Sequence, residues 1–354
     1  WDTMAGVGKA EVVVACEELG PTMRFFCEEL GFALCLISPA DQPRRAVVEG
    51  HGTRLSLEVG QKHSAGMLRI HVAGKPRSPL LAPNGTRVEF VSAEAELDIP
   101  PLQERLVITR PNSGGGWQLG RAGMAYRDLI PCRLGGRVIA SHIRISEGGD
   151  VPDYPHHHGV RFQMIYCHRG WVRVVYEGQG PPFLLNAGDA VLQPPHILHR
   201  VLESSPGLEV VEIGCPAEHD TVAEGHLVLP TAELTPCRLY DGQRFVRHEA
   251  DKAAWRPCAA TACEARDTGI GAATQGLAGA RVLRVADGST AENRHGGEFL
   301  FLFATEGKGT LLVDGRHEQF TEGCSATIPA GMPYAWTGAA CLQLLEVRLP
   351  AVAL

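Results

Sequence analysis

The chain has 354 residues, of which 44% are hydrophobic and 21% charged, so we expect a globular protein of two or three domains. The formal net charge of -7 argues against nucleic acid or an anionic membrane surface as the main partner. No apolar run is long enough to span a membrane, and the N-terminus lacks the pattern of a signal peptide. Eleven cysteines without a CxxC pair favour reduced thiols. These features together predict a cytoplasmic protein.

Many short apolar runs are separated by the 41 glycines and 24 prolines, which is typical of a chain rich in β-strands and turns. The first part predicts the order β-α-β-β-β. A strand over residues 12–15 precedes a helix over residues 21–30, which has Pro21 at its start and Gly31 directly after its end. Three more strands follow, over residues 32–37, 45–49 and 54–59.

The stretch PTMRFFCEELGFAL in this region resembles the helix and following strand of the glyoxalase and extradiol dioxygenase group, the vicinal oxygen chelate fold. A second module of this kind is expected over residues 68–91. The family places a metal-binding His on its first strand and a Glu on its last, but the first strand here reads AEVVVAC, which leaves Glu58 without partners. We therefore predict a small α+β glyoxalase-like domain over residues 1–110, free of metal, with a role in packing or in forming a homodimer.

An internal repeat follows, with an offset of about 135 to 143 residues. Arg127-Asp128 before an apolar strand parallels Arg266-Asp267, GWVRVVYEG parallels GKGTLLVDG, and NAGDAVLQPPHILH parallels TEGCSATIPAGMPY. The same order is kept throughout both copies. Two copies of one β-unit are therefore predicted, over residues 111–230 and 263–354, with residues 231–262 as a connecting segment.

Three histidines of the first copy form a candidate metal site. His156 and His158 are two residues apart, so on a strand both side chains point to the same face, whereas His157 points away. His199 comes from a separate strand, and a small barrel brings such strands face to face around a cavity. Imidazole suits Fe²⁺, our first choice, and also Ni²⁺, Mn²⁺, Zn²⁺ or Cu²⁺.

These segments resemble the two sequence motifs of the cupin superfamily. The positions in register are His156, His158, Gly170, Gly188, Pro194 and His199, with Gln163 where the family usually has Glu and His196 where it has Gly. The resemblance implies a mainly β fold: two tandem cupin barrels, of the double-stranded β-helix or jelly-roll type, preceded by the small α+β domain.

Gln163 changes the expected chemistry of the site. An amide is a neutral, weak oxygen ligand, so the site keeps the charge of the divalent ion and favours a small anionic substrate such as an enolate, phenolate or carboxylate. Three imidazoles and one amide leave about two open positions on an octahedral ion. In the second copy the equivalent residues are Asn293, His295, Leu300 and Tyr334, so this barrel is predicted to be free of metal.

Other polar residues are candidates for roles around the metal. Arg144 is expected to hold an anionic substrate and Tyr166 to act as a base. Gln193, Tyr176, Glu203 and Glu212 are further candidates, and each is more readily explained as structural. No GxSxG elbow or P-loop occurs.

Three functions remain open, in this order. The first is a non-haem dioxygenase, because the chain resembles the quercetinase group of two-barrel dioxygenases, although Gln163 does not favour a flavonol substrate. The second is a redox-neutral lyase, isomerase or hydrolase in which the metal is a Lewis acid. The third is a non-catalytic binding protein like the seed globulins, against which the retained histidines argue.

Overall fold

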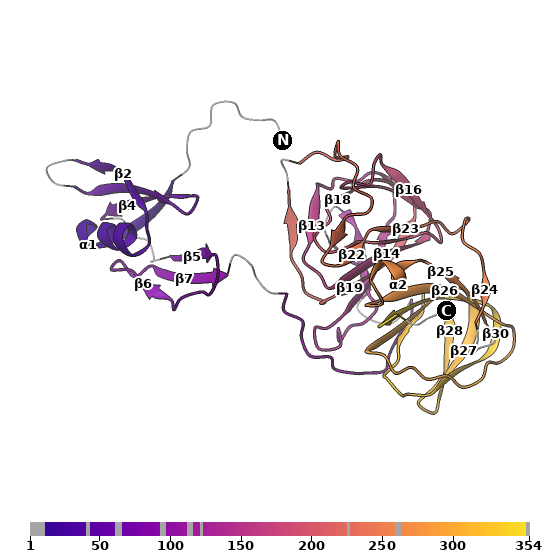
Figure 1. Cartoon of the computed structure of the whole chain (residues 1–354). Coiled ribbons are helices and arrows are strands. Elements are labelled where there is room, and N and C mark those ends of the chain that lie inside the picture. Colours follow the sequence, from indigo (N-terminus) through magenta and orange to yellow (C-terminus); the bar gives the residue numbers. More distant parts are fainter. Residues whose placement is uncertain are drawn as a thin grey trace. The chain divides into compact units, whose positions relative to one another are not determined.

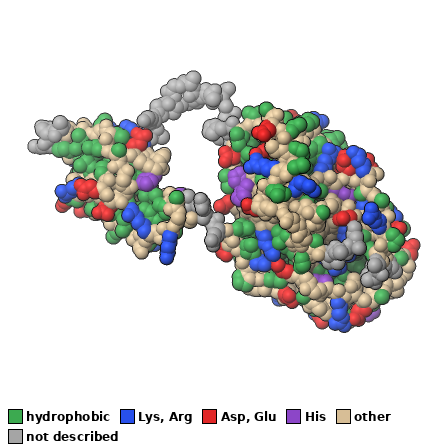
Figure 2. Space-filling model, in the orientation of Figure 1, with side chains coloured by type: hydrophobic (Ala, Val, Ile, Leu, Met, Phe, Trp, Pro, Cys, Tyr) green, Lys and Arg blue, Asp and Glu red, His purple; other side chains and the backbone are tan. Residues whose placement is uncertain are grey.

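The computed structural model describes residues 11–39, 43–60, 66–92, 97–111, 116–120, 123–224, 227–258 and 263–351. The chain divides into two compact units, residues 1–96 and residues 97–354 (Figure 1). All eleven cysteines are free thiols. Among the described residues, no helix is long and apolar enough to cross a membrane. Charged side chains of both signs are interspersed on the face shown in Figure 2.

The first unit contains the predicted β-α-β-β-β order. Its elements are β1 (Val12–Cys16), α1 (Leu19–Arg24) continued by a π-helical segment (Phe25–Glu29), β2 (Ala33–Ser38), β3 (Arg45–Gly50) and β4 (Thr53–Val59). The sheet order is β1-β4-β3-β2, with β1 parallel to β4. The helix begins at Leu19, before the predicted start at Pro21. Pro21 therefore lies in the first turn, where proline is tolerated because the missing N–H needs no partner.

A three-stranded sheet, β5-β7-β6, completes the first unit. Its strands are β5 (Met67–Val72), β6 (Leu80–Leu81) and β7 (Arg87–Ser92). One core, which includes Phe26, Leu57 and Val88, joins both sheets. Glu58 accepts a hydrogen bond from Ser56 and lies 3.4 Å from Arg45. The glyoxalase-like character of this unit stays a prediction.

The second unit contains two β modules that correspond to the two sequence repeats. The first module has a seven-stranded sheet, β23-β17-β14-β19-β11-β10-β9, and a six-stranded sheet, β16-β15-β18-β13-β20, with β12 on β18. Its strands are β9 (Gln118–Leu119), β10 (Ala125–Asp128), β11 (Ile139–Ile145), β12 (Gly149–Asp150), β13 (His156–His158), β14 (Phe162–Arg169), β15 (Trp171–Tyr176), β16 (Phe183–Asn186), β17 (Ala190–Leu192), β18 (His199–Ser204), β19 (Leu208–Cys215), β20 (Thr221–Ala223) and β23 (Val246–His248).

The second module is built on a sheet of order β24-β25-β26-β30-β27-β29-β8, with β28 on β27. Its elements are β8 (Val107–Thr109), β24 (Arg256–Pro257), β25 (Cys263–Asp267), the short helix α2 (Ile270–Ala273), β26 (Gly279–Val285), β27 (Phe299–Val313), β28 (Arg316–Thr321), β29 (Ser325–Thr327) and β30 (Tyr334–Leu349). The long strands β27 and β30 pair through several register shifts between Ala304 and Thr310.

Both modules receive strands from outside their repeats, and for the second module one of these is β24, which comes from the predicted connecting segment and pairs with β25. β8 pairs with β29 of the second module, although residues 107–109 fall within the predicted N-terminal domain. β23 pairs with β17 of the first module, so the predicted connecting segment supplies a strand. That segment also forms the small hairpin of β21 (Leu239–Tyr240) and β22 (Gln243–Arg244), and its residues 259–262 lie outside the described part.

Strand alternation sorts the side chains into separate cores. Phe162, Met164 and Tyr166 on β14 join a core shared with Phe301 and Phe303 of the second module. The alternate face of the same sheet packs inside the first module, through residues such as Cys167, Val191 and Val210. The mainly β prediction is confirmed, but the sheets of the described residues stay open and do not close into a hydrogen-bonded barrel.

Candidate metal centre

The structure brings the three predicted histidines together. β13 and β18 are neighbouring strands (Figure 1). His156 pairs directly with His199, with 4.3 Å between their ring centroids. The ring of His158 lies 5.1 Å from that of His156 and 5.3 Å from that of His199. All three are buried, and one ring nitrogen of each lies within 4.8 Å of the others. This spacing suits three ligands of one ion.

Backbone carbonyls orient the three rings. The Nδ1 atom of His156 lies 2.7 Å from the carbonyl oxygen of Tyr154, that of His158 lies 3.2 Å from Asp220, and that of His199 lies 3.0 Å from Ile197. A carbonyl oxygen only accepts, so each Nδ1 carries the proton and donates it. The lone pair is then on Nε2 in each ring, which is the neutral form that a metal-binding histidine uses.

Gln163 and Glu212 add an amide and a carboxylate to the same cavity. Gln163 is buried, and its Nε2 donates a hydrogen bond of 2.6 Å to Oε1 of Glu212. This bond assigns the amide nitrogen to Glu212 and leaves the amide oxygen, the atom able to bind a metal, at the other end of the group. Glu212 was expected to be structural. The alternation of Val210, Glu212 and Gly214 along β19 puts its side chain on the face that lines the cavity.

The cavity has a volume of about 90 Å³ and mostly apolar walls. Its polar lining consists of Tyr126, His156, His158, Gln163, Tyr176, Gln193, His199, Arg200 and Glu212. Tyr176 stacks on His199 at 5.6 Å, and burial raises the pKa of its phenol, which therefore stays protonated. The apolar part of the wall lowers the local dielectric constant, which strengthens the electrostatic interactions of any ion held inside.

Arg144 and Tyr166 do not line this cavity, in contrast to their expected roles. Ile143 and Ile165 line it, so strand alternation turns their neighbours Arg144 and Tyr166 to the opposite face. The guanidinium of Arg144 stacks on Trp117 at 4.3 Å. Tyr166 lies in the core between the modules, where burial raises its pKa to about 12.

The other polar residues near the site have contacts of their own. Gln193 lines the cavity, whereas Glu203 pairs with Arg173. Arg161 forms an ion pair of 2.8 Å with Glu298 of the second module. His157 faces away from the three histidines and lies 5.4 Å from the ring of His196.

A second cluster of potential ligands, His142, His168 and Glu209, lies on the other face of the same sheet. Nη2 of Arg127 lies 2.9 Å from Nδ1 of His142, and an arginine only donates, so this Nδ1 accepts. Nε2 of His142 then carries the proton and donates it to Glu209 at 2.8 Å. Because that nitrogen has no lone pair and Arg127 is a buried cation, the cluster fits a hydrogen-bonded network better than a metal site.

Burial also sets the charge state of this polar cluster. Burial lowers the pKa of His142 below its usual value and that of His168 to about 4. The hydrogen bond from His142 lowers the pKa of Glu209. At neutral pH the cluster therefore holds two neutral imidazoles and an ionised carboxylate.

The second module has different side chains at the equivalent positions. Asn293 pairs with Tyr334 as His156 pairs with His199, and Leu300 pairs with Arg348 as Gln163 pairs with Gly214. The one nearby imidazole, His295, has Nε2 2.6 Å from the carbonyl oxygen of Ile328, to which it donates. The strand register thus supports the alignment of the two repeats.

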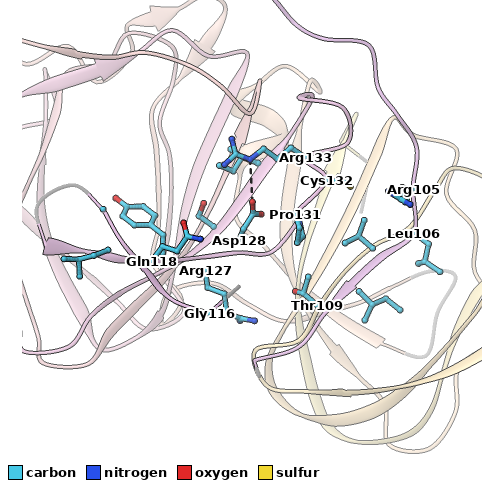
Figure 3. Close-up of a pocket in the computed structure, with 17 residues that line it drawn as sticks. Arg105, Leu106, Thr109, Gly116, Gln118, Arg127, Asp128, Pro131, Cys132 and Arg133 are labelled. Atoms are coloured by element: carbon cyan, nitrogen blue, oxygen red, sulfur yellow. Dashed lines mark ion pairs between the residues drawn. The ribbon is translucent and has the colours of Figure 1, made fainter. Parts of the chain in front are cut away.

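A larger groove, of about 980 Å³, lies beside β8, β9 and β10 (Figure 3). Among its lining residues, Arg133 faces Asp128 at 3.6 Å, and Arg105 and Arg127 add further positive charge. Tyr126 lines both this groove and the histidine cavity. No histidine is among the described residues that line the groove.

Comparison with known families finds one match: the model of the AraC-like ligand binding domain fits residues 140–217. The matched segment includes His156, His158, Gln163, His199 and Glu212. The comparison with curated proteins finds no match.

Solved structures show the fold. Protein Ylba from E. coli is similar with a TM-score of 0.53 and 12% identity, over 73% of this chain and 97% of that chain. A mutant of Bacillus subtilis oxalate decarboxylase has a TM-score of 0.51 and 11% identity, over 72% and 78%. Salicylate 1,2-dioxygenase from Pseudoaminobacter salicylatoxidans, in adducts with gentisate, has a TM-score of 0.50 and 14% identity, over 71% of this chain and 82% of that chain. The chain therefore has a cupin-type fold.

Proposed function

We propose that this chain is a metal-dependent cupin enzyme whose first module binds a divalent transition metal through His156, His158 and His199. The observation that carries this proposal is the common orientation of the three rings, each held by a carbonyl at Nδ1 so that Nε2 holds the lone pair. Gln163 would be a weak fourth ligand through its amide oxygen, positioned by Glu212.

We propose Fe²⁺ as the first choice of ion, and Ni²⁺, Mn²⁺, Zn²⁺ or Cu²⁺ would also suit this donor set. Among the similar structures, a Bacillus subtilis oxalate decarboxylase is described as having Mn(II) centres. Three neutral imidazoles and an amide offset none of the charge of the ion, and Glu212 lies one hydrogen bond behind the amide. We infer that the substrate is a small anion: an enolate, phenolate or carboxylate.

The reaction that we propose is that of a non-haem dioxygenase. The bound metal would supply two open positions, for a chelating anion or for substrate and oxygen. The chain itself would exclude water with its apolar walls, hold His199 against Tyr176, and keep the amide of Gln163 fixed. The likeness to salicylate 1,2-dioxygenase extends to the fold alone.

Two alternatives each have one observation in their favour. Glu212 puts a carboxylate in the cavity, which a redox-neutral lyase, isomerase or hydrolase would use as a proton acceptor. The match of residues 140–217 to a ligand binding domain favours a non-catalytic binding protein. Oxygen consumption during turnover separates the dioxygenase from the redox-neutral enzyme, and the absence of any turnover with a bound ligand favours the binding protein.

The direct experiment is metal analysis of the purified full chain. We expect one transition metal ion per chain in the wild type, and nearly none in a variant with His156→Ala and His158→Ala. His157→Ala is the matched control, because this neighbour points away from the site, and it should keep its metal. Full metal content in the double variant would rule out this site.

We further propose a cytoplasmic location, which the eleven free thiols support. The partner would be a small molecule rather than nucleic acid or a membrane. For the first unit we propose a glyoxalase-like domain that is free of metal, because its first strand lacks histidine. Its role would be in packing or in forming a homodimer.

A further inference from the structure

Three charged side chains lie inside the second module. Glu346 on β30 is almost completely buried, and its carboxylate joins two guanidinium groups. Oε1 lies 2.6 Å from Nε of Arg281 on β26, and Oε2 lies 2.8 Å from Nη2 of Arg348. The side chains of Arg281 and Arg348 are only 18% and 12% exposed. This cluster therefore holds two positive charges against one negative charge.

Strand register shows what this cluster replaces. Arg281 pairs with Glu346 as Ser141 pairs with Glu212 in the first module. Arg348 stands at the position of Gly214. Its Nη2 donates to the hydroxyl of Tyr334, which occupies the position of His199. The second module thus points a permanent cation toward the place where the first module has its histidines.

The positive charge of the cluster is not fully compensated by the protein. Nε of Arg348 is buried and has no hydrogen-bond partner. A buried N–H group without an acceptor is unfavourable, so such groups usually have a hydrogen-bond partner. Among the described residues that line the space at this cluster, the one further carboxylate is Asp267, which is exposed and accepts a hydrogen bond from the backbone of Gly269. Solvent screens its charge.

A cavity of about 320 Å³ opens at this cluster. Its walls include Arg281, Glu346 and Arg348, and Asp267 lies at its exposed rim. Glycines 271, 276 and 279 and alanines 272, 280 and 351 line the remainder, and these small residues leave the space unfilled. Guanidinium groups match the planar geometry of a carboxylate through paired hydrogen bonds.

We propose that the second module binds a small carboxylate in this cavity, between Arg281 and Arg348, without a metal ion. This site is separate from the histidine cavity and goes beyond the proposed function. The ligand would supply the negative charge that the Arg-Glu-Arg cluster lacks and accept a hydrogen bond from Arg348.

The test is calorimetric titration of malonate into the full chain after a chelator has removed all metal. We expect saturable binding of one malonate per chain. Arg348→Gln and Arg281→Gln should each weaken it by at least about tenfold, the general value of a hydrogen bond to a charged group. Arg284→Gln is the matched control, because Arg284 is on the same strand as Arg281, β26, but its side chain is 47% exposed and paired with Glu264. It should bind as the wild type does.

Glu346→Gln distinguishes loss of the binding site from misfolding of the arginine variants. Removing the competing carboxylate should tighten malonate binding by about tenfold, which a damaged protein cannot do. Absence of saturable binding to the metal-free wild type would overturn the proposal, as would unchanged affinity in Arg348→Gln and Arg281→Gln. Since no metal is present, neither result depends on the function proposed for the first module.

Discussion

The two modules of the second unit have the same strand register but different chemistry inside. Glu212 and Glu346 stand at equivalent positions on β19 and β30. In the first module this carboxylate accepts a hydrogen bond from a neutral amide beside three imidazoles, and in the second it joins two guanidinium groups. The comparison shows that a few inward-facing positions decide whether the interior suits a metal ion or an organic anion.

The largest expected effect comes from placing the second module's side chain in the first. Gly214 is closely surrounded there: a Cβ at this position would lie 3.3 Å from Cε1 of His219 and 3.4 Å from Cγ2 of Ile139, so a side chain requires small shifts of these neighbours. Gly214→Arg would add a cation beside Gln163, its strand partner, so we expect metal affinity to fall by more than about 1,000-fold, since two unit charges 4 Å apart repel by about 4 kcal/mol in a protein-like dielectric.

Metal titration followed by calorimetry would measure this loss. Gly214→Ala adds the tight contact without the charge and is the control, for which we expect a much smaller loss. Wild-type affinity in Gly214→Arg would show that this position does not face the metal.

The next effect concerns the polar cluster between the modules. Burial holds the pKa of His168 at about 4, below the usual value near 6.5. Between these values the unfolded chain binds a proton that the folded chain does not, so stability falls as the pH drops from about 6.5 to 4, by up to about 3 kcal/mol. The lowered pKa values of His142 and Glu209 act in the same direction.

Urea unfolding at several pH values would measure this dependence. In His168→Gln the decline over this range should be shallower than in the wild type. An equally steep decline in the variant would assign the pH dependence to other groups.

A smaller effect is expected from the residue that orients the amide. Glu212→Leu removes the acceptor for Nε2 of Gln163, and loss of a residue that positions a ligand generally weakens metal binding 10- to 100-fold. Glu212→Gln keeps an oxygen that accepts this hydrogen bond and should restore most of the affinity. Equal affinities for both variants in a competition assay with a chelator would argue against the positioning role.

The sequence was informative where local periodicity determines direction. His156 and His158 are two residues apart on one strand, and the motif around His199 supplied the third ring, so the trio was predictable. The direction of Arg144 depends on which face of β11 turns inward, and that segment contains no predicted ligand that would show it. Counting from Gln163 along β14 would have placed Tyr166 on the opposite face.

Long-range pairing explains what the sequence analysis missed. Gln163 and Glu212 are 49 residues apart, and they meet only because β14 and β19 are neighbours in the sheet. β8 and β23 are three-residue strands that lie outside both predicted repeats and join the sheets of the modules, and such short segments carry no periodic signal. The Arg-Glu-Arg cluster was likewise hidden, because its members come from two strands of the second repeat.

X-ray absorption spectroscopy of the metal-loaded full chain tests the central claim most directly, because multiple scattering from imidazole rings reports how many histidines bind the ion. The structure predicts three imidazoles in the wild type, and two after His199→Ala in protein that retains metal. A wild-type spectrum with one imidazole or none would contradict the proposal that His156, His158 and His199 share one ion.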